Sequence, residues 1–119
     1  MSAKDFDPNC LFCKIITGEI PSETVYKDAE VIAFADINPA TPVHIMVVPV
    51  KHIVSLAAMA ETDTSIVGKM TAVANKIARD LGLAEKGYRL IINSGPDGGQ
   101  VIQHLHMHLL GGRELKWEQ

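Results

Sequence analysis

A chain of 119 residues is long enough to bury one hydrophobic core and too short for two, so we expect a single domain over residues 1–119. Its 47% hydrophobic content and formal net charge of −3 lack the basic excess of a nucleic-acid-binding protein. Residues 1–9 contain no apolar core of a signal peptide, and no apolar run approaches the ~20 residues that cross a membrane. The sequence therefore favours a cytoplasmic protein that binds neither nucleic acid nor membrane, with residues 1–9 as a flexible N-terminus.

Hydrophobic periodicity and turn residues predict the elements in chain order. A long helix is expected over residues 63–81, because its apolar residues recur every three or four positions. Thr62 or Asp63 can cap its start, and Gly82 ends it. A long helix between groups of strands is typical of an α+β fold, in which the helix covers one face of an antiparallel sheet. The other expected elements are a short helix over residues 10–17 and strands over residues 23–27, 30–36, 44–50, 88–94 and 105–110, the first two joined at Asp28.

Cys10 and Cys13 lie at the start of the short helix. Two cysteines at this spacing can form half of a zinc site, and His52 and His104 are available to complete it. A disulfide, a thioredoxin-like redox pair and two free thiols are the alternatives. Residues 5–9 do not supply the strand that precedes a redox motif, and the lack of an export signal disfavours a disulfide. We therefore expect a structural zinc ion with four protein ligands, and no organic cofactor.

Asp36 ends the second expected strand and is followed by a turn at Asn38-Pro39. A carboxylate at a strand end can accept hydrogen bonds from both hydroxyls of a ribose. The alternative is an ordinary solvent-exposed turn aspartate.

A glycine-rich segment over residues 95–100 joins the last two strands. Glycine lets backbone N–H groups approach an anion closely, so the segment can bind phosphate, although a plain hairpin turn is the alternative. Asn93 and Gln100 add neutral donors of the kind that hold a phosphoryl oxygen.

Three of the five histidines of the chain, His104, His106 and His108, alternate with bulky apolar residues. On a strand, alternate side chains point the same way, so the three rings share the face opposite the long helix. Neutral imidazole is a nucleophile, a proton carrier and a metal ligand near pH 7. An exposed polar strand face is the alternative, but the concentration of histidines indicates an active site.

Residues 104–110 resemble the His-φ-His-φ-His-φ-φ signature of the histidine-triad (HIT) superfamily. The flanking Gly98-Gly99-Gln100 and Gly111-Gly112-Arg113 are similar to the Hint branch, the purine nucleoside phosphoramidases. The resemblance implies one HIT domain with a five-stranded antiparallel sheet, one long and one short helix, and a C-terminal tail over residues 111–119. It also implies that the middle histidine attacks the α-phosphorus of a nucleotide and that the nucleotidyl-histidine is then hydrolysed.

Carried onto this sequence, the resemblance makes His106 the nucleophile. His108, Gln100 and the loop N–H groups would stabilise the phosphoryl oxygens, and His44 would orient the nucleophile or help protonate the leaving group. Val101 occupies a position that is often polar in the family, so either backbone donors suffice there or turnover of the best substrate is slower. The catalytic candidates are His106, His108, His104 and His44. The nucleotide-binding candidates are Asp36, Phe34, Ile37, Leu11, Phe12, Ile15, Ile20, Asn93, Gly99, Gln100, Val101 and Trp117.

The implied substrate is an adenosine 5′-phosphoramidate whose P–N bond is hydrolysed to release AMP. The resemblance also implies zinc bound by Cys10, Cys13, His52 and His104, not required for the chemistry. It further implies a homodimer in which Trp117 reaches the partner's active site. Two alternatives stay open: a dinucleoside polyphosphate hydrolase, disfavoured by the glycine motifs, and a nucleotide-binding regulatory or scaffold protein with incidental activity.

Overall fold

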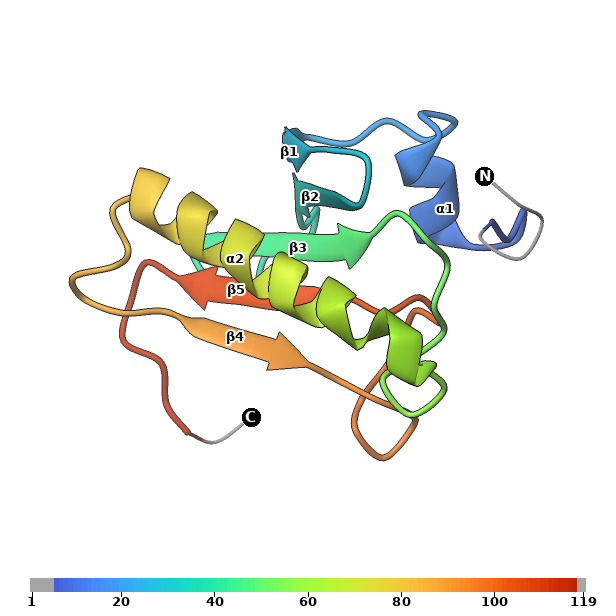
Figure 1. The fold of residues 1–119 in the computed structure, drawn as a ribbon. Helices are drawn as coiled ribbons and strands as arrows, with labels where there is room; N and C mark the ends of the chain where they lie inside the picture. Colours follow the sequence, from blue (N-terminus) through green and yellow to red (C-terminus); the bar gives the residue numbers. More distant parts are fainter. Residues whose placement is uncertain (1–5, 118–119) are drawn as a thin grey trace.

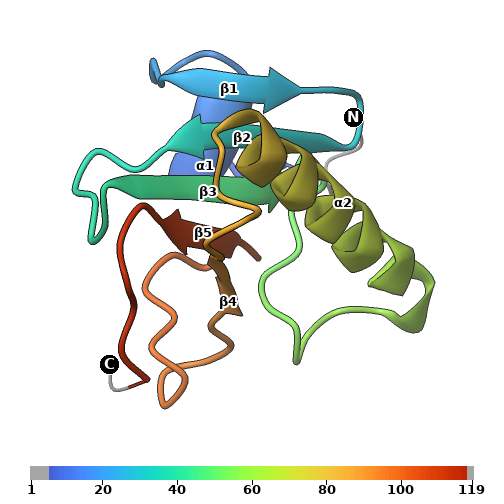
Figure 2. The ribbon, with the colours of Figure 1, turned by 90° about the vertical axis from the view of Figure 1, so that its left-hand side faces the viewer.

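The computed structural model describes residues 6–117 as a single antiparallel sheet with a helix on each face (Figures 1 and 2). The strand order is β1-β2-β3-β5-β4, so that the last strand of the chain lies between β3 and β4. This architecture confirms the α+β fold expected from the sequence. The elements are α1 (Leu11–Ile16), β1 (Thr24–Lys27), β2 (Val31–Ala35), β3 (Val43–Pro49), the 3-10 turn η2 (Glu61–Asp63), α2 (Thr64–Asp80), β4 (Arg89–Ile92) and β5 (Met107–Gly111).

Helix α2 covers one face of the sheet with a single apolar stripe. The stripe packs against the alternate side chains of β2, β3 and β5 that point toward it and forms the larger of two cores. Its buried members are Met70, Val73, Ala74, Ile77 and Ala78.

The ends of α2 agree only in part with the expected caps. Gly82 ends the helix as predicted: its φ is +74°, and the Leu83 N–H donates to the Ala78 carbonyl across the turn. Asp63 is the N-cap, but its side chain makes no capping hydrogen bond. Its carboxylate accepts from Lys51 Nζ at 3.0 Å instead, so Asp63 holds one of the two predicted cap positions but does not cap with its side chain.

Helix α1 lies on the opposite face and builds the second core with β2 and β3 (Figure 2). Met107 and Leu109 of β5 point toward α2, so His108 between them points toward the side of α1. The histidines therefore share the face opposite the long helix, as expected. The buried residues of this second core are Cys10, Phe12, Cys13, Ile16, Ile32, Phe34, Met46 and Val48.

Strand β5 is shorter than the expected strand 105–110, because it begins only at Met107. The Leu105 N–H donates to the carbonyl of Ile53, in the loop after β3, rather than to a neighbouring strand. His104 and His106 therefore precede the ladder, although the inward and outward alternation continues through them.

The structure describes only part of the two terminal segments expected from the sequence. Pro8 and Asn9 form a turn, and the Asn9 N–H donates to the Asp7 carboxylate. Residues 1–5 of the expected flexible N-terminus lie outside the described residues. Gly111, the first residue of the expected tail, belongs to β5. Among residues 6–117, no helix has the length and apolar character needed to span a bilayer.

Candidate active site

A cavity of about 550 Å³ opens on the face of the sheet that carries α1. Its size and its mostly apolar walls suit a small organic ligand. Every nucleotide-binding residue expected from the sequence lines it except Gln100 and Trp117, and His106 and His108 lie at its wall. The lining residues are Leu11, Phe12, Ile15, Ile20, Pro21, Ser22, Phe34, Ala35, Asp36, Ile37, Asn38, Met46, Asn93, Gly99, Val101, Ile102, His106 and His108.

His106 is buried, and its hydrogen bonding leaves one ring nitrogen with a lone pair. Nδ1 lies 2.7 Å from the backbone carbonyl of His104, and a carbonyl can only accept, so Nδ1 carries the proton. Burial lowers the pKa of His106, which keeps the ring neutral near pH 7. The edge-on ring of Phe12, with centroids 5.2 Å apart, supports this orientation. Nε2 is therefore unprotonated and available as a nucleophile.

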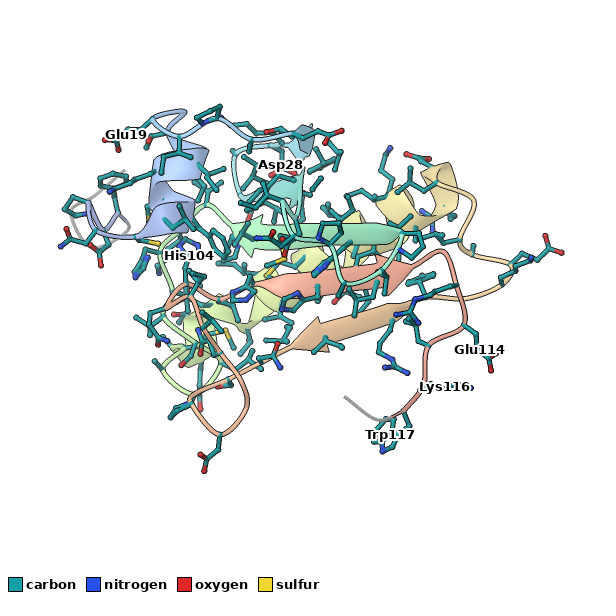
Figure 3. All side chains as sticks on the ribbon, turned by 180° about the vertical axis from the view of Figure 1, so that it is seen from behind. Glu19, Asp28, His104, Glu114, Lys116 and Trp117 are labelled. Atoms are coloured by element: carbon teal, nitrogen blue, oxygen red, sulfur yellow. The ribbon has the colours of Figure 1, made fainter. Side chains whose placement is uncertain are left out.

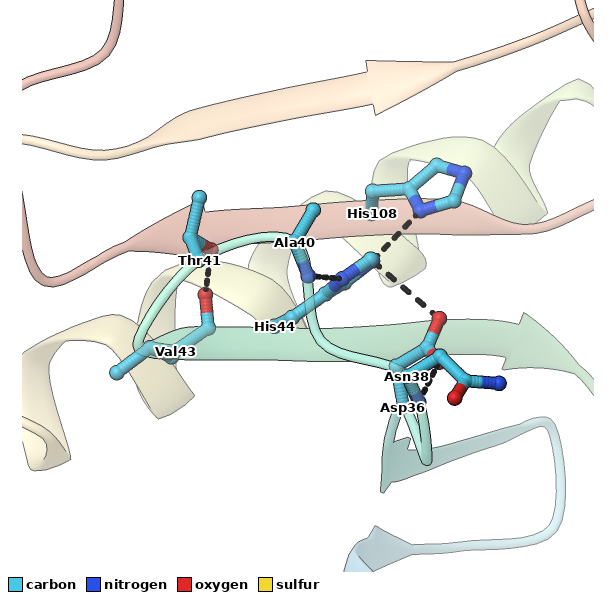
Figure 4. Close-up of polar contacts among 7 residues, drawn as sticks. All are labelled: Asp36, Asn38, Ala40, Thr41, Val43, His44 and His108. Carbon is cyan, nitrogen blue, oxygen red and sulfur yellow. Dashed lines mark hydrogen bonds and ion pairs between the residues drawn. The ribbon is translucent and has the colours of Figure 1, made fainter.

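His108 is held in the opposite tautomer by His44 (Figure 4). The backbone N–H of Ala40 donates to His44 Nδ1 at 3.0 Å, so neutral His44 carries its proton on Nε2. That Nε2–H donates to His108 Nδ1 at 3.0 Å, which leaves the proton of His108 on Nε2. Burial, together with the neighbouring His106 and His44, lowers the pKa of His108 to about 4. The cavity wall thus contains His106 with an unprotonated Nε2 and His108 with an Nε2–H donor.

The glycine loop is shaped by contacts that tolerate no side chain. A Cβ on Gly98 would lie 2.4 Å from the Ser94 carbonyl oxygen, and Gly99 has a φ of +82°. The Asn93 amide donates to the Gly98 carbonyl at 2.7 Å, which fixes the loop against the end of β4. Gly99 and Asn93 both line the cavity, so the loop and the residue after β4 form part of the same wall as His106 and His108.

Gln100 and Trp117 are the two expected binding residues that do not line the cavity. The Gln100 amide donates to the carbonyls of Val54 and Ile102 at 2.7 and 3.0 Å, and its oxygen accepts from the Gly95 N–H. Its side chain therefore holds the loop together, and the direct phosphate contact expected of it does not fit this geometry. Trp117 is 89% exposed on the C-terminal tail, away from the His104 end of the sheet (Figure 3).

His104 does not face the cavity, because its ring joins Cys10, Cys13 and His52 in a compact cluster. The four ligand atoms all lie within 4.8 Å of one another, and both thiols are free. His104 Nδ1 is 3.3 and 3.6 Å from the two sulfurs and 3.1 Å from His52 Nδ1. Ligand bond lengths around tetrahedral zinc imply about 3.6 Å between sulfur and nitrogen and about 3.3 Å between nitrogens.

His104 of this cluster is already in the right protonation state to bind a cation. His104 Nε2–H donates to the Pro49 carbonyl at 2.8 Å, which leaves the Nδ1 lone pair directed at the cluster. Burial lowers the pKa of His104 to about 4, so the ring stays neutral. Burial raises the pKa of the Cys13 thiol to about 11, so this ligand would lose its proton as the metal binds. The residues therefore fit a four-coordinate zinc ion. Of the catalytic candidates, His104 contributes its backbone carbonyl to His106 and its ring to this cluster.

Sequence reasoning did not single out Ala40 or Pro49, which set the tautomers of His44 and His104. Both act through backbone groups, so no residue type marks them. Pro21, Ser22, Ala35, Asn38, Met46 and Ile102 complete the cavity wall and were not predicted either.

Comparison with known proteins shows which family the chain belongs to. A purine nucleoside phosphoramidase from Escherichia coli strain K12 is 49% identical over 105 residues, 88% of each chain. A 14 kDa zinc-binding protein from Zea mays is 48% identical over 113 residues, covering 93% of this chain and 88% of that protein. A histidine triad protein from Clostridium difficile superposes with a TM-score of 0.92 at 47% identity, covering 95% of this chain and 98% of that one. The HIT domain family matches residues 17–115, and the chain belongs to that family.

Proposed function

We propose that this protein hydrolyses the P–N bond of adenosine 5′-phosphoramidates and releases AMP. The pairing of an Nε2 lone pair on His106 with an N–H donor on His108 carries the proposal. Nε2 of His106 attacks the α-phosphorus, and the P–N bond breaks as the P–Nε2 bond forms. The amine leaves with the bonding electron pair and takes a proton from water. A second water then attacks the phosphorus, which frees AMP and restores His106.

The surrounding residues support each part of such a substrate. Leu11, Phe12 and Ile15 of α1 supply an apolar wall for a purine, and Asp36 lies at the rim where it can accept from ribose hydroxyls. In this proposal the His108 N–H stabilises the charge that develops on a phosphoryl oxygen. The name of the E. coli relative, a purine nucleoside phosphoramidase, supports the same substrate class.

The decisive experiment measures steady-state turnover of a fluorogenic adenosine phosphoramidate by wild type and His106→Ala. We expect turnover to fall at least about 100-fold, because the covalent route is lost. Lys76→Ala, a substitution at an exposed residue that pairs with Asp80 on α2, serves as the control and should keep wild-type turnover. Denaturing mass spectrometry of rapidly quenched wild type should find AMP attached to the protein, and none on His106→Ala.

The same assay separates the alternatives. Faster release of AMP from a dinucleoside polyphosphate than from any phosphoramidate would favour the polyphosphate hydrolase. Binding of AMP with equal or absent turnover in wild type and His106→Ala would favour a nucleotide-binding regulatory protein.

We also propose that Cys10, Cys13, His52 and His104 hold a structural zinc ion. Four protein ligands leave no open position, so the metal would stabilise the fold and take no part in the reaction. Metal analysis should find one zinc per chain in wild type and much less in Cys10→Ala. A metal content that the substitution leaves unchanged would contradict the site.

We further propose a homodimer in which the tail contributes to the partner's active site. The support is the exposure of Trp117 and the position of β4 at an edge of the sheet, where its outer side pairs with no described strand. Analytical ultracentrifugation tests the oligomeric state, and Trp117→Ala tests the tail through substrate preference. The two free thiols, finally, support a reducing compartment such as the cytoplasm.

A further inference from the structure

The Nε2–H group of His44 lies between Asp36, the residue expected to bind the ribose, and His108, the histidine expected to contact the phosphate. Nε2 of His44 lies 3.0 Å from Nδ1 of His108 and 3.5 Å from Oδ2 of Asp36 (Figure 4). Because Nδ1 of His44 accepts from the Ala40 backbone, Nε2 carries the only nitrogen-bound proton of the neutral ring. A single donor thus faces two acceptors, a neighbouring ring and a carboxylate.

The two oxygens of Asp36 are not equivalent. Oδ1 accepts from the backbone N–H of Asn38 at 2.8 Å, which pins the carboxylate to the turn after β2. Oδ2 faces His44 and belongs to a side chain that is 22% exposed and lines the cavity. A ligand hydroxyl that donates to Asp36 therefore competes with His44 for the charge on this carboxylate.

We propose that Asp36 acts both as the sugar ligand and, through His44, as a positioning residue for His108. The inference rests on the proposed function and deepens it. When ribose hydroxyls donate to the carboxylate, it becomes a weaker acceptor for His44. The Nε2–H of His44 then goes more fully to His108, which is held more firmly as an Nε2–H donor. A sugar that is remote from phosphorus thereby strengthens the hydrogen bond that stabilises the transferring phosphoryl group.

The geometry distinguishes this coupling from simple packing. His44 is buried, so the field of Asp36 at its ring is little screened by water. Asp36 also raises the pKa of His44 against the larger lowering effect of burial, which reports the same electrostatic contact. At pH 7 both His44 and His108 stay neutral. What changes on ligand binding is how the Nε2–H of His44 is shared between His108 and Asp36.

The kinetic test compares an adenosine phosphoramidate with its 2′,3′-dideoxy analogue in wild type, His44→Leu and His44→Gln. In wild type, removal of the hydroxyls should lower kcat about 5-fold as well as raise KM, since part of a transition-state hydrogen bond is lost. His44→Leu should lower kcat about 10- to 100-fold with the natural sugar and make kcat nearly equal for the two substrates. His44→Gln keeps an N–H donor and should recover most of the kcat. An undiminished effect of the sugar on kcat in His44→Leu would overturn the proposal.

A second readout needs no turnover. Nitrogen-15 NMR at pH 7 reports which ring nitrogen of His108 carries the proton, because burial keeps its pKa near 4. AMP should increase the Nε2–H population of His108 relative to 2′,3′-dideoxy-AMP, and Asp36→Asn, at the partly exposed rim, should abolish that difference. Identical His108 signals with the two nucleotides would overturn the coupling even in an active enzyme. Absence of turnover by wild type would contradict the proposed function alone, and the NMR comparison would still decide the coupling.

Discussion

The turn between β1 and β2 depends on one carboxylate, and its removal gives a stability prediction. Asp28 accepts hydrogen bonds from the Tyr26 hydroxyl at 2.6 Å and from the backbone N–H groups of Glu30 and Val31 at 2.7 and 2.9 Å. It also pairs with Lys69 of α2 at 3.2 Å, which ties the hairpin to the helix. The Tyr26 hydroxyl, more than any other neighbour, holds the pKa of Asp28 well below its usual range.

Replacement of Asp28 by Ala should cost about 2 kcal/mol of unfolding free energy. Each hydrogen bond contributes on the order of 1 kcal/mol and the ion pair less, and partial exposure of the carboxylate reduces their sum. A chain of this length unfolds with an entropy near 0.25 kcal/mol/K, so Tm should fall about 8 °C at pH 7 and fixed protein concentration. Asp80→Ala breaks an exposed ion pair with Lys76 and should shift Tm by about 2 °C at most.

The lowered pKa of Asp28 also predicts how the destabilisation by Asp28→Ala changes with pH. A carboxyl whose pKa is lower in the folded state stabilises the protein above its unfolded pKa, about 4, and loses that contribution as pH falls. The difference in unfolding free energy between wild type and Asp28→Ala should therefore stay constant from pH 8 to about pH 5 and shrink below pH 4. Differential scanning fluorimetry and urea unfolding measure it. A shift no larger than that of Asp80→Ala, or a difference that grows on acidification, would refute the reasoning.

Three further predictions follow from packing and from the metal cluster. Leu105→Ala, at a fully buried position beneath α2, should destabilise by about 2–5 kcal/mol in urea unfolding, and a loss under 1 kcal/mol would contradict its place in the core. Gly98→Ala should weaken AMP binding measured by calorimetry, because the new Cβ must displace the Ser94 carbonyl. Gly68→Ala on α2 is the matched control: its Cβ meets no atom within 4 Å, and the substitution should stabilise the protein by about 0.5–1 kcal/mol. Chelation should lower the Tm of wild type but not that of Cys10→Ala, and equal lowering in both would point to a metal bound elsewhere.

The sequence contained the local part of the candidate site. Alternation of His104, His106 and His108 with apolar residues settles which side chains share a face, because the pleat of an extended chain has a period of two. The alternation survives where the ladder hydrogen bonds do not, since Leu105 bonds to Ile53 and the strand proper begins at Met107. Patterning thus predicts the side on which a residue lies better than it predicts where a strand begins.

Two expected roles, those of Gln100 and Asp63, do not match the contacts in the structure, because each side chain meets a partner distant in sequence. Gln100 has the chemistry of a phosphate ligand, but Val54, 46 residues earlier, takes its amide. Asp63 has the chemistry of a helix cap, but Lys51 takes its carboxylate. In both cases the side chain has the expected hydrogen-bonding chemistry, but a group from another segment, the Val54 carbonyl or the Lys51 ammonium, is its partner.

The sequence by itself determined the fold class, the stripe of α2, the stop at Gly82 and the residue types of the candidate site. Each of these depends on neighbours within a few positions, where helix and strand geometry dictate the contacts. Only the tertiary structure decided that β5 inserts between β3 and β4, which brings His44 against His108 from 64 residues away. That contact sets the protonated nitrogen of His108, because a tautomer is chosen by the partner a ring meets.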